Sequence, residues 1–157
     1  MLAWSSSKLT VREATGRNDG PEIEGWQRLT GNSRGDAWCG SYQAGGQKAC
    51  GLKFPAGAGG SYNWFKDARR TYYLKGVRGS IDSIRPGHQV GFYYANLKRI
   101  GHIARTVSPS RVPRRGNVRG WYTNEGNTGT GGGRDGAGVH LLLRASWEFH
   151  AAANWLY

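Results

Sequence analysis

Apolar residues recur at helical spacing in the first half of the chain. In residues 21–29, Ile23, Trp26 and Leu29 fall on one face, and a proline followed by two acids is typical of a first helical turn. We expect this face to pack in the core. The remaining predicted helices lie at residues 7–14, at residues 39–44, ending near Gly45-Gly46, and at residues 61–70, with Ser61 as the N-cap.

From residue 80 the pattern changes to short apolar and aromatic runs that are typical of strands. The Pro86-Gly87 turn leads into the first of them, at residues 88–94, and three others follow at residues 101–107, 118–125 and 138–144. The aromatic tail from Trp147 to Leu156 is predicted to add a closing strand or to pack across the core. Helices that precede strands predict an α+β domain, in which the N-terminal helices pack on a small antiparallel sheet.

Length and composition indicate a single domain that covers residues 1–157. The 157 residues are 38% hydrophobic and 12% aromatic, which is enough to form one core, and no apolar run approaches the length of a membrane span. Residues 1–8 lack the basic start and the apolar run of a secretory signal. We therefore expect a monomer that is synthesised in the cytoplasm and reaches any outer target by release or delivery.

The charge is strongly positive, with 22 Lys and Arg against 10 Asp and Glu, a formal net charge of +12 and a pI near 10.2. The partner of such a chain should be anionic. Nucleic acid is one candidate, with the Arg-rich stretch from Arg105 to Arg119 as a possible contact. Because the basic residues are spread along the chain and no nucleic-acid-binding motif is present, an anionic bacterial envelope explains the charge equally well, and we expect no specific nucleic acid.

Cys39 follows a Gly-Asp-Ala turn and opens a predicted helix. The unpaired N–H groups of a helix start stabilise a thiolate and can receive the oxyanion of an attacked amide. The plainer interpretation is a small buried hydrophobic residue beside Trp38. The other cysteine, Cys50, leaves a Cys39–Cys50 bridge open, and neither cysteine has metal-ligand spacing, so we expect no metal and no cofactor.

A histidine and a carboxylate follow on the predicted strands. His102 lies on one strand, and Glu125 and Asn127 lie at the end of the next, where antiparallel pairing can bring an imidazole beside a carboxylate. His88 starts a strand, and His140 and His150 have no acidic neighbour in a comparable turn. The sequence therefore favours His102 as the base for a Cys39 nucleophile.

These motifs, in this order, resemble the CHAP-type amidases and peptidases, cysteine- and histidine-dependent wall hydrolases of the papain-like superfamily. The resemblance runs nearly end to end and rests on Arg12-Glu13 to Pro21-Glu22-Ile23, Gly-x-x-Trp38-Cys39, Pro86-Gly87, Gly101-His102, Glu125-Gly126-Asn127-Thr128, Gly136 to Val139, and Arg144. It implies a papain-like fold. It also implies that Cys39 is the nucleophile, His102 the base, Glu125 the residue that orients the imidazole, and Asn127 a further polar member of the catalytic site.

Two departures from the CHAP pattern stand beside the resemblance. His88 replaces the aspartate that often follows Pro-Gly, and Gly40-Ser41-Tyr42 replaces the usual small and aromatic run after the cysteine. The papain signature Cys-Gly-Ser-Cys-Trp is also absent. The implied function is cleavage of a peptidoglycan amide, either between sugar and peptide or within the peptide, by a phage endolysin or a delivered antibacterial effector. The alternative is a non-catalytic basic protein that binds nucleic acid or wall polymer.

Overall fold

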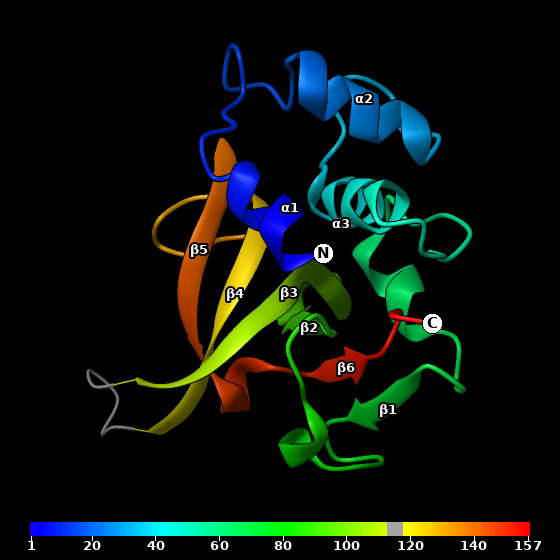
Figure 1. Cartoon of the computed structure of the whole chain (residues 1–157), viewed down its shortest axis with the longest axis vertical. Coiled ribbons are helices and arrows are strands. Elements are labelled where there is room, and N and C mark those ends of the chain that lie inside the picture. Colours follow the sequence, from blue (N-terminus) through cyan, green and yellow to red (C-terminus); the bar gives the residue numbers. More distant parts are fainter. Residues whose placement is uncertain (113–117) are drawn as a thin grey trace.

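The helices come before the strands, as the sequence pattern predicts. The computed structural model describes residues 1–112 and 118–157, and Figure 1 shows its helices gathered on one side of a curved sheet. The α-helices are α1 (Leu2–Ser7), α2 (Pro21–Leu29) and α3 (Cys39–Ala49), and η1 (Ser61–Phe65) is a 3-10 helix. The strands are β1 (Thr71–Leu74), β2 (Gln89–Tyr94), β3 (Arg99–Val112), β4 (Val118–Thr128), β5 (Gly138–Ala145) and β6 (Ala151–Ala153).

The six strands form one antiparallel sheet with the order β1-β6-β2-β3-β4-β5. The strand at the C-terminal end, β6, lies between β1 and β2 and so joins the two parts of the sheet, which confirms the prediction of a closing strand. The expected α+β class with an antiparallel sheet is likewise confirmed. Part of the basic stretch from Arg105 to Arg119, namely residues 113–117, lies outside the described residues.

Helix α3 packs directly on the middle of the sheet, and a glycine allows the close approach. A Cβ added at Gly126 of β4 would lie only 2.7 Å from the rings of Trp38 and Tyr42. Both rings are fully buried, beside Trp26 of α2. The first turn of α3 therefore packs between α2 and the two long neighbouring strands, β3 and β4.

The helix predicted over residues 7–14 is wrong. Helix α1 ends at Ser7, and the chain then becomes extended so that it pairs with β5. Val139 donates a backbone hydrogen bond to Val11 (3.1 Å), and Glu13 donates one to Ala137 (2.8 Å). Long-range pairing with the sheet outweighs the weak local helix propensity of this segment.

The helix predicted to end near Gly45-Gly46 continues to Ala49. A Cβ at Gly45 would lie 2.5 Å from Trp26, and one at Gly46 would lie 2.8 Å from Trp4. The two glycines therefore let tryptophan rings lie against the helix backbone. This packing outweighs the intrinsic cost of glycine within a helix, which is about 1 kcal/mol per residue.

The helix predicted over residues 61–70 is also wrong. A 3-10 helix covers only Ser61–Phe65, and the strand β1, which the sequence pattern missed, begins at Thr71. Ser61 is not a helix cap, because its hydroxyl donates to the carbonyl oxygen of Ile100 on β3 (3.2 Å). No helix in the described parts of the chain is long and apolar enough to cross a membrane.

Candidate active site

Cys39 is the first residue of α3. Trp38 is the N-cap, and its carbonyl oxygen accepts the first helical hydrogen bond, from Tyr42 (2.8 Å). The N–H groups of the first turn have no partner within the helix, and they form the positive end of the helix dipole. Cys39 is only 5% exposed, so its side chain is nearly buried.

Both cysteines are free thiols. Cys50 is the C-cap at the other end of α3, beyond a helix of 11 residues. At a rise of about 1.5 Å per residue the two Cα atoms are roughly 16 Å apart, well above the separation of about 7 Å that a disulfide tolerates. The Cys39–Cys50 bridge that the sequence left open is therefore not formed.

His102 and Glu125 lie together, as the sequence predicts. Nε2 of His102 on β3 is 2.8 Å from Oε2 of Glu125 on the neighbouring strand β4, and both side chains are fully buried. The imidazole also packs on Phe92 of β2, with ring centroids 5.6 Å apart. The carboxylate and the phenyl ring together fix the plane of the imidazole.

Two further residues hold the Glu125 carboxylate. Arg144 of β5 makes a bidentate pair, with Nε to Oε1 at 2.8 Å and Nη2 to Oε2 at 2.7 Å, and Thr123 donates its hydroxyl to Oε1 at 2.6 Å. Burial alone would raise the pKa of Glu125, but the bonds and charges of Arg144 and His102 lower it to about 2. Glu125 is therefore an anion at neutral pH despite its burial.

The pKa of His102 is raised to about 9. Burial acts to lower it, and the interactions with Cys39 and Glu125 outweigh that effect. Since Nε2 is bonded to Glu125, the ring nitrogen left for the thiol is Nδ1. This buried atom has no hydrogen-bond partner among the described residues, so the thiol interacts with the ring without an aligned hydrogen bond. The interacting groups therefore follow one another in the order Cys39 thiol, His102 imidazole, Glu125 carboxylate and Arg144 guanidinium.

Asn127 bonds to the residue before Cys39 and not to the imidazole. Its Oδ1 accepts the backbone N–H of Trp38 (2.8 Å), and its Nδ2 donates to Asn18 Oδ1 (3.0 Å) and to the carbonyl oxygen of Gly136 (3.2 Å). None of these bonds reaches Cys39 or His102. Asn127 has a φ of 57°, at an irregular register between β4 and β5, and asparagine tolerates this left-handed backbone better than most residues.

A closed ring of four hydrogen bonds surrounds Trp38. Trp38 donates its backbone N–H to Asn127, and Asn127 donates to the side chain of Asn18. Asn18 donates its backbone N–H to Glu13 Oε2 (3.0 Å), and Glu13 Oε1 accepts from Trp38 Nε1 (2.9 Å). The ring ties the loop before α2, the end of β4 and the residue before Cys39 into one unit.

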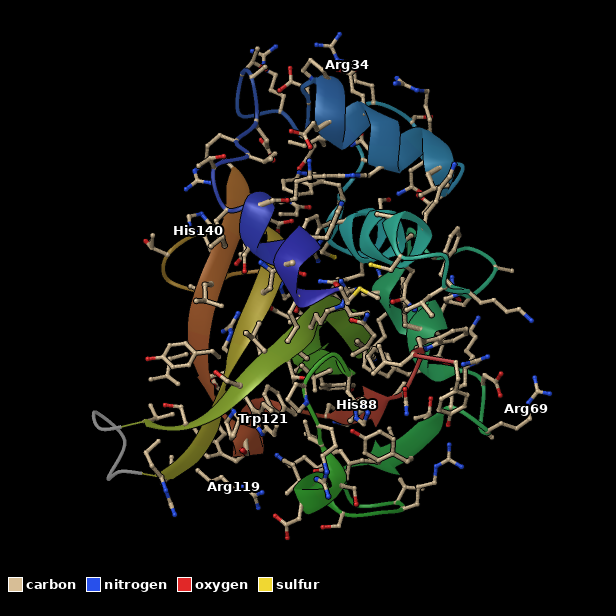
Figure 2. The ribbon with its side chains drawn as sticks, in the orientation of Figure 1. Arg34, Arg69, His88, Arg119, Trp121 and His140 are labelled. Atoms are coloured by element: carbon tan, nitrogen blue, oxygen red, sulfur yellow. The ribbon has the colours of Figure 1, made fainter. Side chains whose placement is uncertain are left out.

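The other histidines have different surroundings. His88 bonds to the Tyr72 hydroxyl through Nδ1 (2.7 Å), and His150 stacks on Tyr93 (4.8 Å between centroids). His140 lies opposite Glu125 in the β4–β5 register, but none of the described hydrogen bonds joins the two side chains. Figure 2 labels His88, just before β2, and His140, on β5, in separate parts of the molecule.

Sequence reasoning missed Thr123, Arg144 as a partner of Glu125, and the roles of Glu13 and Asn18. One signal was available for Thr123, because residues two apart on a strand share a face. The others depend on strand register and on loop contacts between distant segments, which no spacing reveals.

Within residues 1–112 and 118–157 no group of three or more His, Cys, Asp or Glu side chains is arranged to hold a metal ion. Comparison of the chain with models of protein families, with curated proteins and with solved structures found no match. The interpretation of the site therefore depends on its geometry. A thiol at a helix start beside an oriented imidazole is an arrangement suited to nucleophilic attack on a carbonyl carbon.

Proposed function

We propose that the chain is a cysteine-dependent peptidoglycan hydrolase with a papain-like, CHAP-type catalytic domain. The observation that carries the proposal is the buried His102. Its Nε2 is fixed by Glu125, and its unpartnered Nδ1 is left for Cys39 at the start of α3. A structural cysteine needs no such neighbour, whereas a nucleophile needs a base that a third group orients.

The proposed reaction has two stages. In the first, the thiol proton of Cys39 passes to Nδ1 of His102, and the sulfur bonds to the amide carbon while the carbonyl electrons move to oxygen. The N–H groups of the α3 start face the oxyanion. The oxyanion electrons then re-form the carbonyl as the carbon–nitrogen bond breaks, and the leaving nitrogen takes the proton from His102, which leaves a thioester on Cys39.

In the second stage water replaces the amine. His102 takes a proton from water, the oxygen bonds to the thioester carbon, and the carbon–sulfur bond breaks as the sulfur regains a proton. Glu125 stays ionised throughout, because Arg144 and His102 hold its pKa low, and it stabilises the imidazolium that forms in each stage. Thr123 and Arg144 position Glu125 and do not touch the substrate.

The positive charge supports an anionic substrate surface. A net charge of +12 attracts the chain to a bacterial envelope and concentrates it near the wall. The proposed bond is an amide, either between sugar and stem peptide or within the peptide, and the setting is lysis by a phage enzyme or attack by a delivered effector. The alternative is a non-catalytic protein that binds wall polymer or nucleic acid. The test below distinguishes the two functions.

The test is digestion of purified wall sacculi. We expect wild type and Cys50→Ala to reduce the turbidity and Cys39→Ala to leave it unchanged, since only Cys39 has the base. Mass analysis of the released fragments identifies the bond. Undiminished digestion by Cys39→Ala, or no digestion of any wall preparation by the folded wild type, would remove the basis of the proposal.

A further inference from the structure

A basic cavity of about 730 Å³ lies apart from the Cys39–His102 pair. Four cationic side chains and one carboxylate line it: Lys53, Lys66, Arg69, Arg70 and Asp67. Figure 2 shows Arg69 projecting outward on the side of the molecule where Figure 1 marks the C-terminus. An excess of cations around a cavity of this size fits an anionic ligand.

Among the described residues of the lining, Asp67 has the one carboxylate side chain, and two arginines already share it; Arg70 Nη1 also donates to the main-chain oxygen of Tyr157. Asp67 is 3.1 Å from Nη2 of Arg69 and 3.9 Å from Nε of Arg70. Among the described residues, Lys53 and Lys66 make no ion pair, so their charges are not neutralised by the protein. The two lysines are therefore the side chains of this cavity that would attract an anion most strongly.

Cations cover the aromatic rings in and around the cavity. The guanidinium carbon of Arg70 lies 4.5 Å from the ring centroid of Trp155 and 5.5 Å from that of Tyr157, and Nζ of Lys66 lies 5.0 Å from that of Tyr62. Rings used in this way offer less free face for stacking nucleic-acid bases. The lining therefore favours an anionic chain without bases.

The cavity and the nucleophile share one segment of the chain. Lys53 and Lys66 are at the two ends of residues 53–66, and the middle of this segment lies against the start of α3. A Cβ added at Gly40 would collide with the carbonyl oxygens of Ala58 and Gly59. Trp64 donates its indole N–H to the Ala58 oxygen (2.8 Å) and so fixes this turn. A ligand held in the cavity is thereby held at a fixed offset from Cys39.

We propose that this cavity binds the phosphodiester groups of an anionic polymer attached to peptidoglycan, which places the wall relative to Cys39. The proposal rests on the proposed function for its biological setting, and it adds the class of ligand. Phosphodiesters keep their charge at every physiological pH, repeat along a flexible chain, and are well bound by lysine point charges. Carboxylates of the stem peptide and phosphates of nucleic acid are the competing sources of charge.

The experiment compares two pairs of charge reversals in a Cys39→Ala background, which keeps the wall intact. The test variant is Lys53→Glu/Lys66→Glu. The matched control is Lys48→Glu/Arg78→Glu, which changes the net charge equally at two exposed residues that do not line the cavity. Binding is measured on sacculi that carry the phosphodiester polymer, on sacculi stripped of it by acid, and on single-stranded DNA.

We expect the test pair to weaken binding to polymer-bearing sacculi about tenfold and the control pair no more than about threefold, with equal effects of the two pairs on stripped sacculi and on DNA. Equal losses from both pairs on polymer-bearing sacculi would overturn the proposal. A specific loss that persists on stripped sacculi would assign the cavity to carboxylates, and a specific loss on DNA would assign it to nucleic acid; either result overturns it. Since binding needs no cleavage, these outcomes are independent of the proposed chemistry.

Discussion

The two ends of helix α3 each carry a free cysteine, and their surroundings differ in what they offer a thiol. Cys39 begins the helix, is 5% exposed and interacts with His102. Cys50 is the C-cap, is partly exposed, and donates its backbone N–H to the carbonyl oxygen of Gln47 (3.1 Å). The helix dipole stabilises an anion at the first position and disfavours one at the second.

A basic side chain interacts with the thiol at each end, but only one of the two can shuttle a proton. The buried Arg105 interacts with Cys50, and burial lowers the pKa of Arg105 to about 10. Its guanidinium stays charged at neutral pH and is therefore not a base. His102 can both receive and return a proton. Both thiols thus have a basic side chain nearby, but only the Cys39 end has an oriented base, and chemistry is therefore expected at that end.

The largest expected effect comes from removing the base at the Cys39 end. His102→Gln keeps a side-chain donor for Glu125 but cannot shuttle a proton, so we expect wall cleavage to fall about 10³-fold while the fold is retained. His88→Gln is the matched control, because the hydrogen bonds of the His88 ring go to Tyr72 and to the backbone of Arg85 and not to Cys39 or Glu125. Wall digestion rates and circular dichroism of both variants check this. Loss of activity in His88→Gln with activity retained in His102→Gln would reverse the assignment.

A smaller effect is expected from Glu125→Gln, and it has a pH signature. The folded pKa of His102 is raised from 6.5 to about 9, so its stabilising contribution is complete below pH 6.5 and is lost as the pH rises through 9. The folded pKa of Glu125 is lowered from 4.5 to about 2, so its contribution is complete above pH 4.5 and is lost as the pH falls through 2. The pair therefore contributes most between pH 4.5 and 6.5.

Glu125→Gln removes the charge that supports the imidazolium. We expect the wild-type free energy of unfolding to decrease between pH 6.5 and 9, by about 1.4 kcal/mol for each unit of pKa difference, and the variant to show a shallower decrease. Turnover should fall about 10²-fold with wall binding intact. Urea unfolding at a series of pH values measures the slope. Identical slopes in the two proteins would show that Glu125 does not set the protonation of His102.

The smallest effect is expected from the ring around Trp38. Glu13→Gln replaces one of the two acceptors that face the N–H groups of Trp38 and Asn18 with a donor, so the backbone before Cys39 should lose its fixed position. We expect about a tenfold drop in turnover. Glu22→Gln is the control, since Glu22 pairs with Lys8 at the surface and has no hydrogen bond to the ring among the described residues. Equal turnover of the two variants would show that the ring has no influence on the nucleophile.

The sequence was sufficient to predict the parts of the molecule that depend on local pattern. Helix α2, the start of α3 and the four later strands follow from apolar periodicity and turn residues, and the meeting of His102 with Glu125 follows from antiparallel pairing of neighbouring strands. Where it failed, long-range contacts decided the structure. Pairing with β5 extends the chain after Ser7, and tryptophan packing carries α3 through its glycines.

The sequence predicted which residues belong to the candidate site better than it predicted how they are arranged. The resemblance placed Asn127 in the catalytic group, but its hydrogen bonds hold the backbone of Trp38 instead. Its left-handed φ results from an irregular register at the end of β4, which no residue spacing encodes. The bidentate pair of Arg144 with Glu125 likewise depends on which residues of β4 and β5 lie opposite one another.

The most direct test of the account is the rate at which iodoacetamide labels the two cysteines of one wild-type molecule at pH 7, resolved by peptide mass mapping. Exposure alone favours Cys50, because Cys39 is 5% exposed. We predict that Cys39 is nevertheless labelled faster, and that His102→Gln slows Cys39 about tenfold or more while Cys50 is unchanged. Faster labelling of Cys50 in the wild type, or a Cys39 rate that is the same with and without His102, would contradict the claim that Cys39 and His102 form a reactive pair.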